Sequence, residues 1–433
     1  MARLNECILY RNFEHGEILD KMAELMNAWE QNAPDLKEKE GLFFECANGL
    51  VETAGSYGFS GNLWHCYLTF LLVNNENAFS TACEIRGAVN GSINELALND
   101  FGVFKELYDF DLTVLDEAFG ISCCKVLGDY TNTGSNSKMF NSRIRDRICD
   151  LSKTLAAAES TEEFMKDMVQ FYKDFGVGKL GLHKAFRVGH DENDNVEIQP
   201  ITRIAHVKLE DLVGYEIPKQ KLIENTEAFV RGRKANNCLL FGDAGTGKSS
   251  SIKGILNRYY DEGLRIIEVY KHQFQDLNDV IAQIKNRNYK FIIYMDDLSF
   301  EEFEIEYKYL KAVIEGGLEK KPDNILIYAT SNRRHLIKEN WSDRDDVESQ
   351  NGMHRSDTME EKLSLVNRFG VTINYSKPSQ KEYFNIVVEL AHRAGLTISD
   401  DELRAEANKW ELSHGGISGR TAQQFINYLL GTV

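Results

Sequence analysis

Residues 238–260 spell CLLFGDAGTGKSSSIKGILNRYY, and this stretch indicates the fold class of the chain. Its central part, Gly242 to Ser249, fits the pattern GxxxxGK followed by Ser or Thr, with a short apolar run before it and a stretch of helical character after it. A glycine-rich loop between a strand and a helix presents successive backbone N–H groups at the helix N-terminus, where they bind phosphate. The stretch therefore predicts an α/β domain with a phosphate-binding loop (P-loop).

The P-loop also predicts a nucleotide and a metal ion. Lys248 is expected to reach the β- and γ-phosphates, and the Ser249 hydroxyl to ligate Mg²⁺. Such a metal needs a carboxylate at the end of a neighbouring strand, and FIIYMDD, residues 291–297, supplies Asp296 for the Mg²⁺ shell and Asp297 to polarise the attacking water. The alternative for this pair is a helix cap. The predicted nucleotide-binding residues of the loop are Gly242, Asp243, Ala244, Gly245, Thr246, Gly247, Lys248, Ser249 and Ser250.

Short apolar runs alternate with helical stretches around this loop, which is typical of a mostly parallel sheet flanked by helices. We expect a five-stranded parallel sheet in an α/β domain over residues 196–376, and a separate helical domain over residues 377–433. The predicted strands are residues 238–241, 264–270, 291–295, 324–329 and 371–375, and the predicted C-terminal helices lie near 379–394, 400–410 and 418–430.

The N-terminal part of the chain contains few helix breakers, since Pro34 is the first of only 5 prolines and the next one is Pro200. Apolar residues recur there at spacings of three and four, as in an amphipathic helix. Residues 1–200 hold 18 Lys and Arg against 32 Asp and Glu. We therefore predict a mainly helical, acidic domain over residues 1–195 that binds an unidentified protein partner or regulates the rest of the chain.

The composition excludes several classes of protein. The 433 residues include 42% hydrophobic and 27% charged side chains, as in ordinary globular proteins, and the formal net charge of −17 disfavours nonspecific adhesion to nucleic acid or anionic lipid. The most apolar run, residues 63–73, is too short to span a membrane. The N-terminus lacks the apolar region of a secretory signal, and no cysteine pair is spaced CxxC. We expect a cytoplasmic protein with reduced thiols.

Residues 197–433 resemble the AAA+ ATPase superfamily, because the P-loop and the acidic pair are followed by further matching motifs in the order of that superfamily. Asn332, in ILIYATSN, resembles sensor 1, which positions the lytic water. Arg368, in LSLVNRFG, resembles the arginine finger that acts on a neighbour's nucleotide, and Arg420, in GGISGRTAQQF, resembles sensor 2 on a helical lid. The segment DLVGYEIPK, residues 211–219, resembles the stretch that packs on adenine, which makes Val213, Gly214 and Tyr215 candidates for that role.

Four longer stretches resemble an uncharacterised bacterial family of AAA+ ATP-binding proteins: NNCLLFGDAGTGKSSSIKGIL, MDDLSFEE, EGGLEKKPDNILIYATSNRRHL and EEKLSLVNRFG. This resemblance implies an α/β wedge with a helical lid and ATP bound at subunit junctions of a homo-oligomer, a ring or a filament. Two features depart from the superfamily pattern. Asp297 replaces the usual Glu, which leaves slow hydrolysis open, and Arg333 and Arg334 compete with Arg368 as the arginine that acts in trans.

The leading hypothesis is an ATPase that couples Mg-ATP hydrolysis to conformational work on a macromolecular partner. Two alternatives remain. The first is a nucleic-acid-associated ATPase similar to the helicase loaders, which share Asp-Asp-Leu at the acidic pair, and the second is a nucleotide-dependent switch or scaffold that does not hydrolyse ATP. A small-molecule kinase fits less well, because the RFG and GR segments resemble those of ring ATPases.

Overall fold

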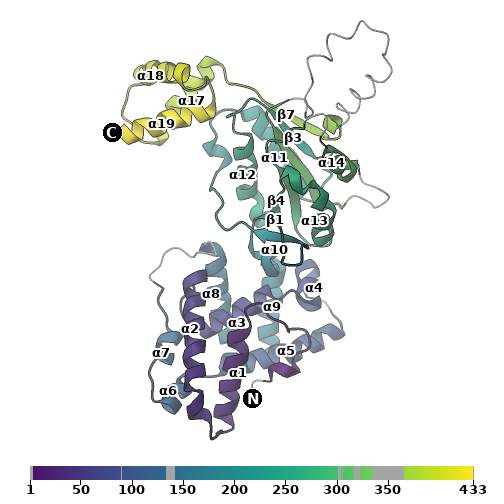
Figure 1. Cartoon of the computed structure of the whole chain (residues 1–433), viewed down its shortest axis with the longest axis vertical. Helices are drawn as coiled ribbons and strands as arrows, with labels where there is room; N and C mark the ends of the chain where they lie inside the picture. Colours follow the sequence, from purple (N-terminus) through teal and green to yellow (C-terminus); the bar gives the residue numbers. More distant parts are fainter. Residues whose placement is uncertain are drawn as a thin grey trace. The chain divides into compact units, whose positions relative to one another are not determined.

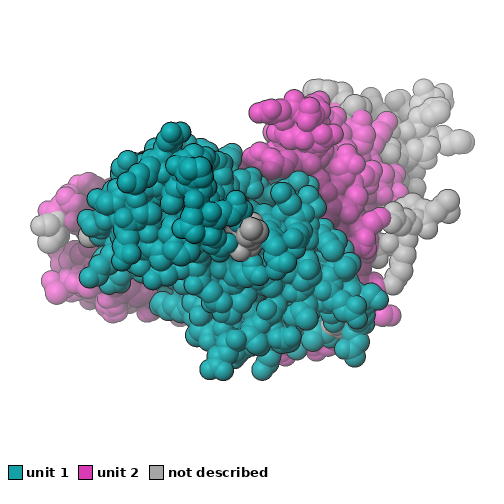
Figure 2. Space-filling view, turned by 90° about the horizontal axis from the view of Figure 1, so that it is seen from below, with its two compact units in different colours: residues 1–183 teal, residues 184–433 magenta. Residues whose placement is uncertain are grey.

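The computed structural model describes residues 3–88, 90–132, 142–300, 304, 306–315, 322–333, 336 and 365–432. The chain forms two compact units, Met1–His183 and Lys184–Val433, which Figure 2 colours separately. The predicted domain boundary at residue 195 falls inside the second unit, because residues 185–190 form a strand of that unit's sheet. The predicted boundary at residue 376 separates two parts of the same unit.

The first unit is a bundle of helices around one core (Figure 1). Helix α3 is buried along nearly its whole length, and Trp64, Tyr67 and Leu68 are among its buried residues. The other helices bury one stripe each against it or against one another, as the apolar spacing predicts. The helices are α1 Glu17–Glu30, α2 Glu40–Tyr57, α3 Leu63–Asn74, α4 Ala78–Arg86, α5 Ser92–Asp109, α6 Thr113–Phe119, α7 Cys124–Gly128, α8 Ser142–Ala157, α9 Thr161–Phe175 and α10 Gly178–Leu182, with short 3₁₀ turns at Leu4–Glu6 and Leu36–Lys39.

The second unit contains a seven-stranded sheet in the order β2-β1-β4-β5-β6-β3-β7. All neighbouring strands are parallel except the hairpin of β1 and β2. Five strands are those predicted from the sequence, so the predicted fold class is confirmed with two strands more than expected. The bounds are β1 Ala185–His190, β2 Val196–Pro200, β3 Cys238–Gly242, β4 Leu264–Glu268, β5 Lys290–Met295, β6 Ile325–Ser331 and β7 Val371–Tyr375.

Helices cover both faces of this sheet. On one face lie α11, Glu216–Val230, and α12, Lys248–Tyr259, which share a core with alternate residues of the strands. On the other face lie α13, Leu277–Ile284, and α14, Glu306–Glu315 (Figure 1). The 3₁₀ turns Leu209–Asp211, Tyr260–Glu262 and Lys271–Asp276 connect these elements. Because the strands are parallel, their carboxyl ends meet at one edge of the sheet, where ligands of such folds bind.

Three C-terminal helices, close to the predicted ranges, form a small domain with its own core. They are α17 Gln380–Arg393, α18 Asp400–Ser413 and α19 Gly419–Thr432. Ser379 and Ser399 cap the first two helices by accepting hydrogen bonds from backbone N–H groups at the third position. Tyr383, Leu403 and Phe425 are buried where the three helices meet. We call these three helices and the turns between them the lid.

The part of the chain that the structure describes contains neither a membrane-spanning helix nor a cluster of metal ligands. None of its helices is both long enough and apolar enough to cross a membrane. No group of three or more His, Cys, Asp or Glu side chains in these residues is arranged to hold a metal ion. All eight cysteines lie in this part, and none of them forms a disulfide bond there.

Candidate nucleotide-binding site

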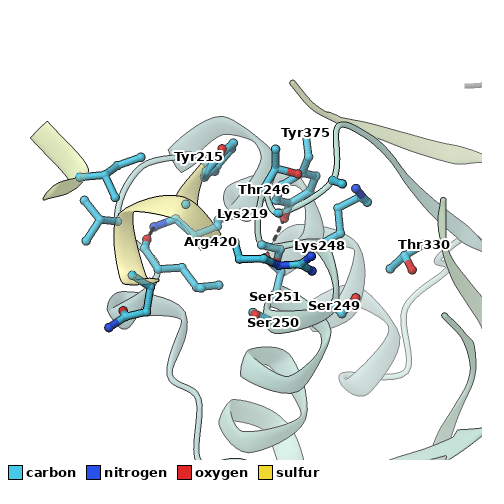
Figure 3. A pocket seen from close by; sticks show the side chains of 18 of the residues that line it. Tyr215, Lys219, Thr246, Lys248, Ser249, Ser250, Ser251, Thr330, Tyr375 and Arg420 are labelled. Carbon is cyan, nitrogen blue, oxygen red and sulfur yellow. Dashed lines mark hydrogen bonds between the residues drawn. The ribbon is translucent and has the colours of Figure 1, made fainter. Parts of the chain in front are cut away.

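A cavity of about 610 Å³ lies at the carboxyl edge of the sheet, between the lid and the remaining α/β part of the second unit, which we call the wedge (Figure 3). Its wall includes the segment before α11, the loop from β3 to α12, the ends of β5, β6 and β7, one side of α17, and the N-terminal turns of α19. The residues from the wedge include Val213, Tyr215, Ala244 to Ser251, Asp296, Asp297, Thr330 and Asn332, and those from the lid include Gly419, Arg420, Gln423 and Gln424.

The P-loop has the conformation that its glycines allow. Strand β3 ends at Gly242 and helix α12 begins at Lys248. Gly242, Gly245 and Gly247 have φ values of 133°, 76° and 90°, a region that side chains other than glycine rarely adopt. At Gly242 a Cβ atom would also lie 2.3 Å from the Tyr375 carbonyl oxygen of β7. Glycine is therefore required both for the turn and for the close approach of β7.

Lys248 is buried, at 7% exposure, and lies at the centre of the loop. Its Nζ atom donates hydrogen bonds to the carbonyl oxygens of Gly242 at 2.9 Å and Asp243 at 2.7 Å, and to Asn332 Oδ1 at 3.0 Å. Burial lowers the pKa of Lys248, and three nearby carboxylates oppose this effect only in part. The ammonium group is thus fixed in the cavity wall with its charge only partly compensated.

Asp296 lies at the end of β5 and accepts hydrogen bonds from three hydroxyl groups, one on helix α12, one on strand β5 and one on strand β6. Its Oδ1 atom accepts hydrogen bonds from Ser249 at 2.7 Å, Tyr294 at 2.7 Å and Thr330 at 2.5 Å. Burial alone would raise the pKa of Asp296, but these three hydrogen bonds together hold it below its ordinary value. The carboxylate therefore stays ionised.

The pair of Ser249 and Asp296 fits a magnesium ion. Both ligating groups are oxygen donors, which Mg²⁺ prefers, and their 2.7 Å separation is close to the roughly 2.9 Å between neighbouring ligands in an octahedral shell. Thr330 and Tyr294 would then fix the orientation of the carboxylate from behind.

Asp297 and Asn332, predicted from separate motifs, are brought into contact. Asn332 Nδ2 donates a hydrogen bond of 2.7 Å to Asp297 Oδ1, while the amide oxygen of Asn332 accepts from Lys248. The Asp297 backbone has φ of 50° and its N–H donates to Thr330 Oγ1 at 2.9 Å. These contacts form a polar chain from Lys248 through Asn332 to Asp297.

Tyr215 lines the apolar end of the cavity with Val213. Its ring stacks on Tyr375 with centroids 5.6 Å apart, and its hydroxyl is buried without a hydrogen-bond partner. Burial raises the pKa of Tyr215 to about 12, so the hydroxyl stays protonated. Lys219 braces this segment by donating to the Leu212 carbonyl oxygen at 2.7 Å. The result is a stacked aromatic wall with an unsatisfied polar group.

The lid contacts the P-loop directly. The Arg420 backbone N–H donates to the Gly245 carbonyl oxygen at 3.1 Å, and the Arg420 side chain extends from the lid helix into the cavity (Figure 3). Ser418 caps α19 by accepting from the Thr421 N–H at 3.0 Å. A Cβ atom on Gly245 would lie 3.0 Å from Ser418 Oγ and 3.1 Å from Arg420 Cβ. A side chain at this position would therefore force Ser418 and Arg420 of the lid to shift slightly, besides straining the positive φ of the loop.

Some predicted residues lie beside the cavity or away from it. The wall includes Ala244 to Ser250, Val213 and Tyr215, whereas Gly242, Asp243 and Gly214 support it from behind. Asp243 accepts a hydrogen bond from the Lys377 N–H at 2.8 Å. Arg368 lies before β7, outside the cavity wall, and forms an ion pair with Glu315. Arg333 is exposed beyond Asn332, and Arg334 lies outside the described residues.

Thr330 and Tyr294 were not predicted as site residues, although both bind Asp296. A signal for each is present in the sequence, since Thr330 precedes Asn332 by two residues and Tyr294 precedes Asp296 by two, and side chains two apart on a strand point to the same side. Lys219 and Tyr375 carry no comparable signal, because their places in the wall depend on how α11 and β7 pack.

Comparisons with known proteins identify a family for this chain. A family described as "Protein of unknown function (DUF815)" matches residues 182–433. No curated protein matches the chain. A solved structure titled as the RuvB Holliday junction branch migration motor of Thermotoga maritima is similar, at 17% identity with a TM-score of 0.35, over 51% of this chain and 63% of that one. A point mutant of the same protein gives 17% and 0.36 over the same shares. The chain thus spans less than two thirds of those structures.

Proposed function

The chain belongs to the DUF815 family of proteins of unknown function, and from the geometry of its cavity we propose that it is an ATPase that binds and hydrolyses Mg-ATP. The observation that supports this most is the polar chain of Lys248, Asn332 and Asp297 beside the Ser249–Asp296 pair. A phosphate cradle, a metal shell and a carboxylate for water activation are thereby assembled in one cavity.

The residues of the chain have separable roles in this proposal. The backbone N–H groups of the P-loop and the Lys248 ammonium group bind the β- and γ-phosphates, and Ser249 and Asp296 hold Mg²⁺. The metal supplies charge neutralisation when bound. Asp297 accepts the proton of the attacking water, and Asn332 orients that water while it holds the Asp297 carboxylate in place. Arg420, from the lid, pairs with the phosphates and couples their state to the lid.

Adenine is the base that we propose for the apolar end of the cavity. Val213 and the Tyr215–Tyr375 stack offer a flat apolar wall, and Gly214, with φ of 82°, lets the chain turn close to it. The unpartnered Tyr215 hydroxyl provides a donor or acceptor for a polar edge of the base or the ribose.

We further propose that the protein works as a homo-oligomer and uses hydrolysis for conformational work on a macromolecular partner. Arg368 does not line the cavity of its own chain and pairs there with Glu315. We therefore propose that it acts on the γ-phosphate bound by a neighbouring subunit. The partner is proposed to bind the acidic helical unit.

Nucleotide binding and turnover measured on the same samples test the proposal. The wild-type chain should turn over ATP only with Mg²⁺, Lys248→Ala should lose nucleotide binding, and Asp297→Asn should bind ATP but lose about 10²-fold or more in kcat. Lys253→Ala, an exposed lysine of the same helix α12, is the matched control and should behave as wild type. Tight ATP binding without any wild-type turnover would instead establish the switch alternative.

A further inference from the structure

Two cysteines of the first unit lie in contact, one from α3 and one from α8. The sulfur atoms of Cys66 and Cys149 are 4.0 Å apart, with the Cys66 thiol donating a hydrogen bond to Cys149. The helices that carry them pack against each other, so the contact belongs to the core of the unit. A disulfide bond between them needs the sulfurs to approach by about 2 Å.

The surroundings of the two thiols differ. Cys66 is buried, and its sulfur lies 3.6 Å from the Ser60 carbonyl oxygen and 3.5 Å from Ser152 Oγ. Cys149 is half-buried. The hydrogen bond from Cys66 lowers the pKa of Cys149, and a backbone hydrogen bond at Ser60 and the Arg145 guanidinium lower it further against the effect of burial. Cys149 is thus the nucleophilic member of the pair, since the thiolate is the reactive form.

A surface cavity lies beside the pair, although neither cysteine lines it, and Cys149 itself is partly exposed. A surface cavity of about 380 Å³ is lined by Ser60 and Ser152, the residues that contact the Cys66 sulfur, and also by Lys153. Cys123 offers a comparison, because it is also half-buried, yet burial raises the pKa of its thiol. Cys123 also has a hydrogen-bonded thiol neighbour, Cys124, but burial has the larger effect on its pKa. Exposure alone therefore does not distinguish Cys149, whereas its contact with a thiol of another helix, Cys66 of α3, does.

We propose that Cys149 and Cys66 form a peroxide-sensitive thiol site, in which Cys149 is oxidised first and Cys66 then closes a disulfide between α3 and α8. The Cys149 thiolate attacks one oxygen of hydrogen peroxide, the O–O bond breaks, and the hydroxide that leaves takes up the proton lost by Cys149, giving water and a sulfenic acid. Cys66 sulfur then attacks the Cys149 sulfur, the S–O bond breaks, and the hydroxide leaves as water with the Cys66 proton.

One peroxide molecule is reduced to two waters while two thiols become one disulfide, so no further reductant or oxidant is needed. The bond joins residues 83 apart in the sequence and closes a long loop within the first unit. Such a cross-link restricts the unfolded chain, and a thiol reductant reverses it.

Mass spectrometry of the full-length chain tests the proposal. One equivalent of hydrogen peroxide should remove two hydrogen atoms per chain, and non-reducing peptide maps should locate the bond between Cys66 and Cys149. Cys66→Ala should trap Cys149 as a sulfenic acid that dimedone labels, and Cys149→Ser should form no disulfide. Cys123→Ser is the matched control and should behave as wild type.

Three outcomes would overturn the proposal: dimedone labelling of Cys123 ahead of Cys149 in Cys66→Ala, a disulfide between two chains, or an unchanged mass in wild type after peroxide treatment. Cys66→Ser serves as a second trap if the alanine variant loses its helical circular dichroism spectrum, and it should give the same adduct on Cys149. The proposal does not depend on ATP hydrolysis, so its failure and that of the proposed function are distinguishable.

Discussion

Asp297 stands where the resemblance to the AAA+ superfamily predicts a Glu, and its backbone conformation favours the shorter side chain. Its φ of 50° lies in the left-handed region, which Asp and Asn adopt more readily than longer side chains. We predict that Asp297→Glu lowers the free energy of unfolding of the second unit by about 1 kcal/mol, whereas Asp297→Asn leaves it nearly unchanged. Urea titrations of both variants give the comparison. A Glu variant that is as stable as wild type and hydrolyses ATP faster would show that side-chain length, and not the backbone, limits the rate.

Asp296 predicts a pH dependence of stability. Its pKa in the folded state is below that of the unfolded chain, so its carboxylate stabilises the fold above about pH 4, and this contribution is lost as the pH falls through the folded value. Asp296→Asn should therefore be less stable than wild type at pH 7, and the difference should shrink on acidification to about pH 3. Urea unfolding of the two proteins across this range measures it. A difference that widens towards low pH would contradict the proposed hydrogen-bonded carboxylate.

At the scale of elements, the contact between the P-loop and the N-terminus of α19 should link ATP affinity to the lid. In Gly245→Ala the new methyl group meets Ser418 and Arg420 at about 3 Å, so these lid residues must shift by a few tenths of an ångström. We predict a rise of about tenfold in the KM for ATP, measured by steady-state turnover. Gly263→Ala is the matched control, because Gly263 also has positive φ, at 94°, but nothing within 4 Å of the added carbon. Equal effects of the two substitutions would show that only backbone strain matters.

Some helices and strands could be predicted from the sequence and others could not. Strands β3 to β6 were predictable because buried parallel strands are continuous apolar runs, and the P-loop because its glycines must follow such a run. The edge strand β7, VTINY, was predictable from its β-branched and aromatic residues. The β1–β2 hairpin was not, because its polar turn, residues 191–195, has the composition of a linker. The turn is ordered by Asp191, which accepts hydrogen bonds from the N–H groups of Asn193 and Asn195. The contact between Gly245 and the lid depends on tertiary packing that no local pattern encodes.

At the scale of the whole molecule, the two units differ in net charge. Residues 1–183 contain 16 Lys and Arg and 28 Asp and Glu, whereas residues 184–433 contain 34 and 39. Acidic surfaces repel phosphate backbones and favour basic partners. The proposed partner of the first unit is therefore a basic protein surface, and a nucleic acid, if one binds, is expected to contact residues 184–433 with the steep salt dependence of phosphate contacts.

The assembly proposal leads to the last prediction, on Arg368. Within its own chain this guanidinium pairs with Glu315 outside the cavity, so a catalytic role requires the site of a second subunit. Arg368→Ala should bind ATP normally and lose about 10³-fold in kcat, as expected when a trans-acting arginine is removed.

Asp297→Asn has an intact Arg368 but a disabled site of its own. Mixed oligomers of the two variants should therefore regain turnover above the sum of the separate proteins in a steady-state assay, and Arg333→Ala should retain wild-type activity. Loss of activity in Arg333→Ala with none in Arg368→Ala would transfer the role to Arg333, which follows β6, whereas Arg368 precedes β7.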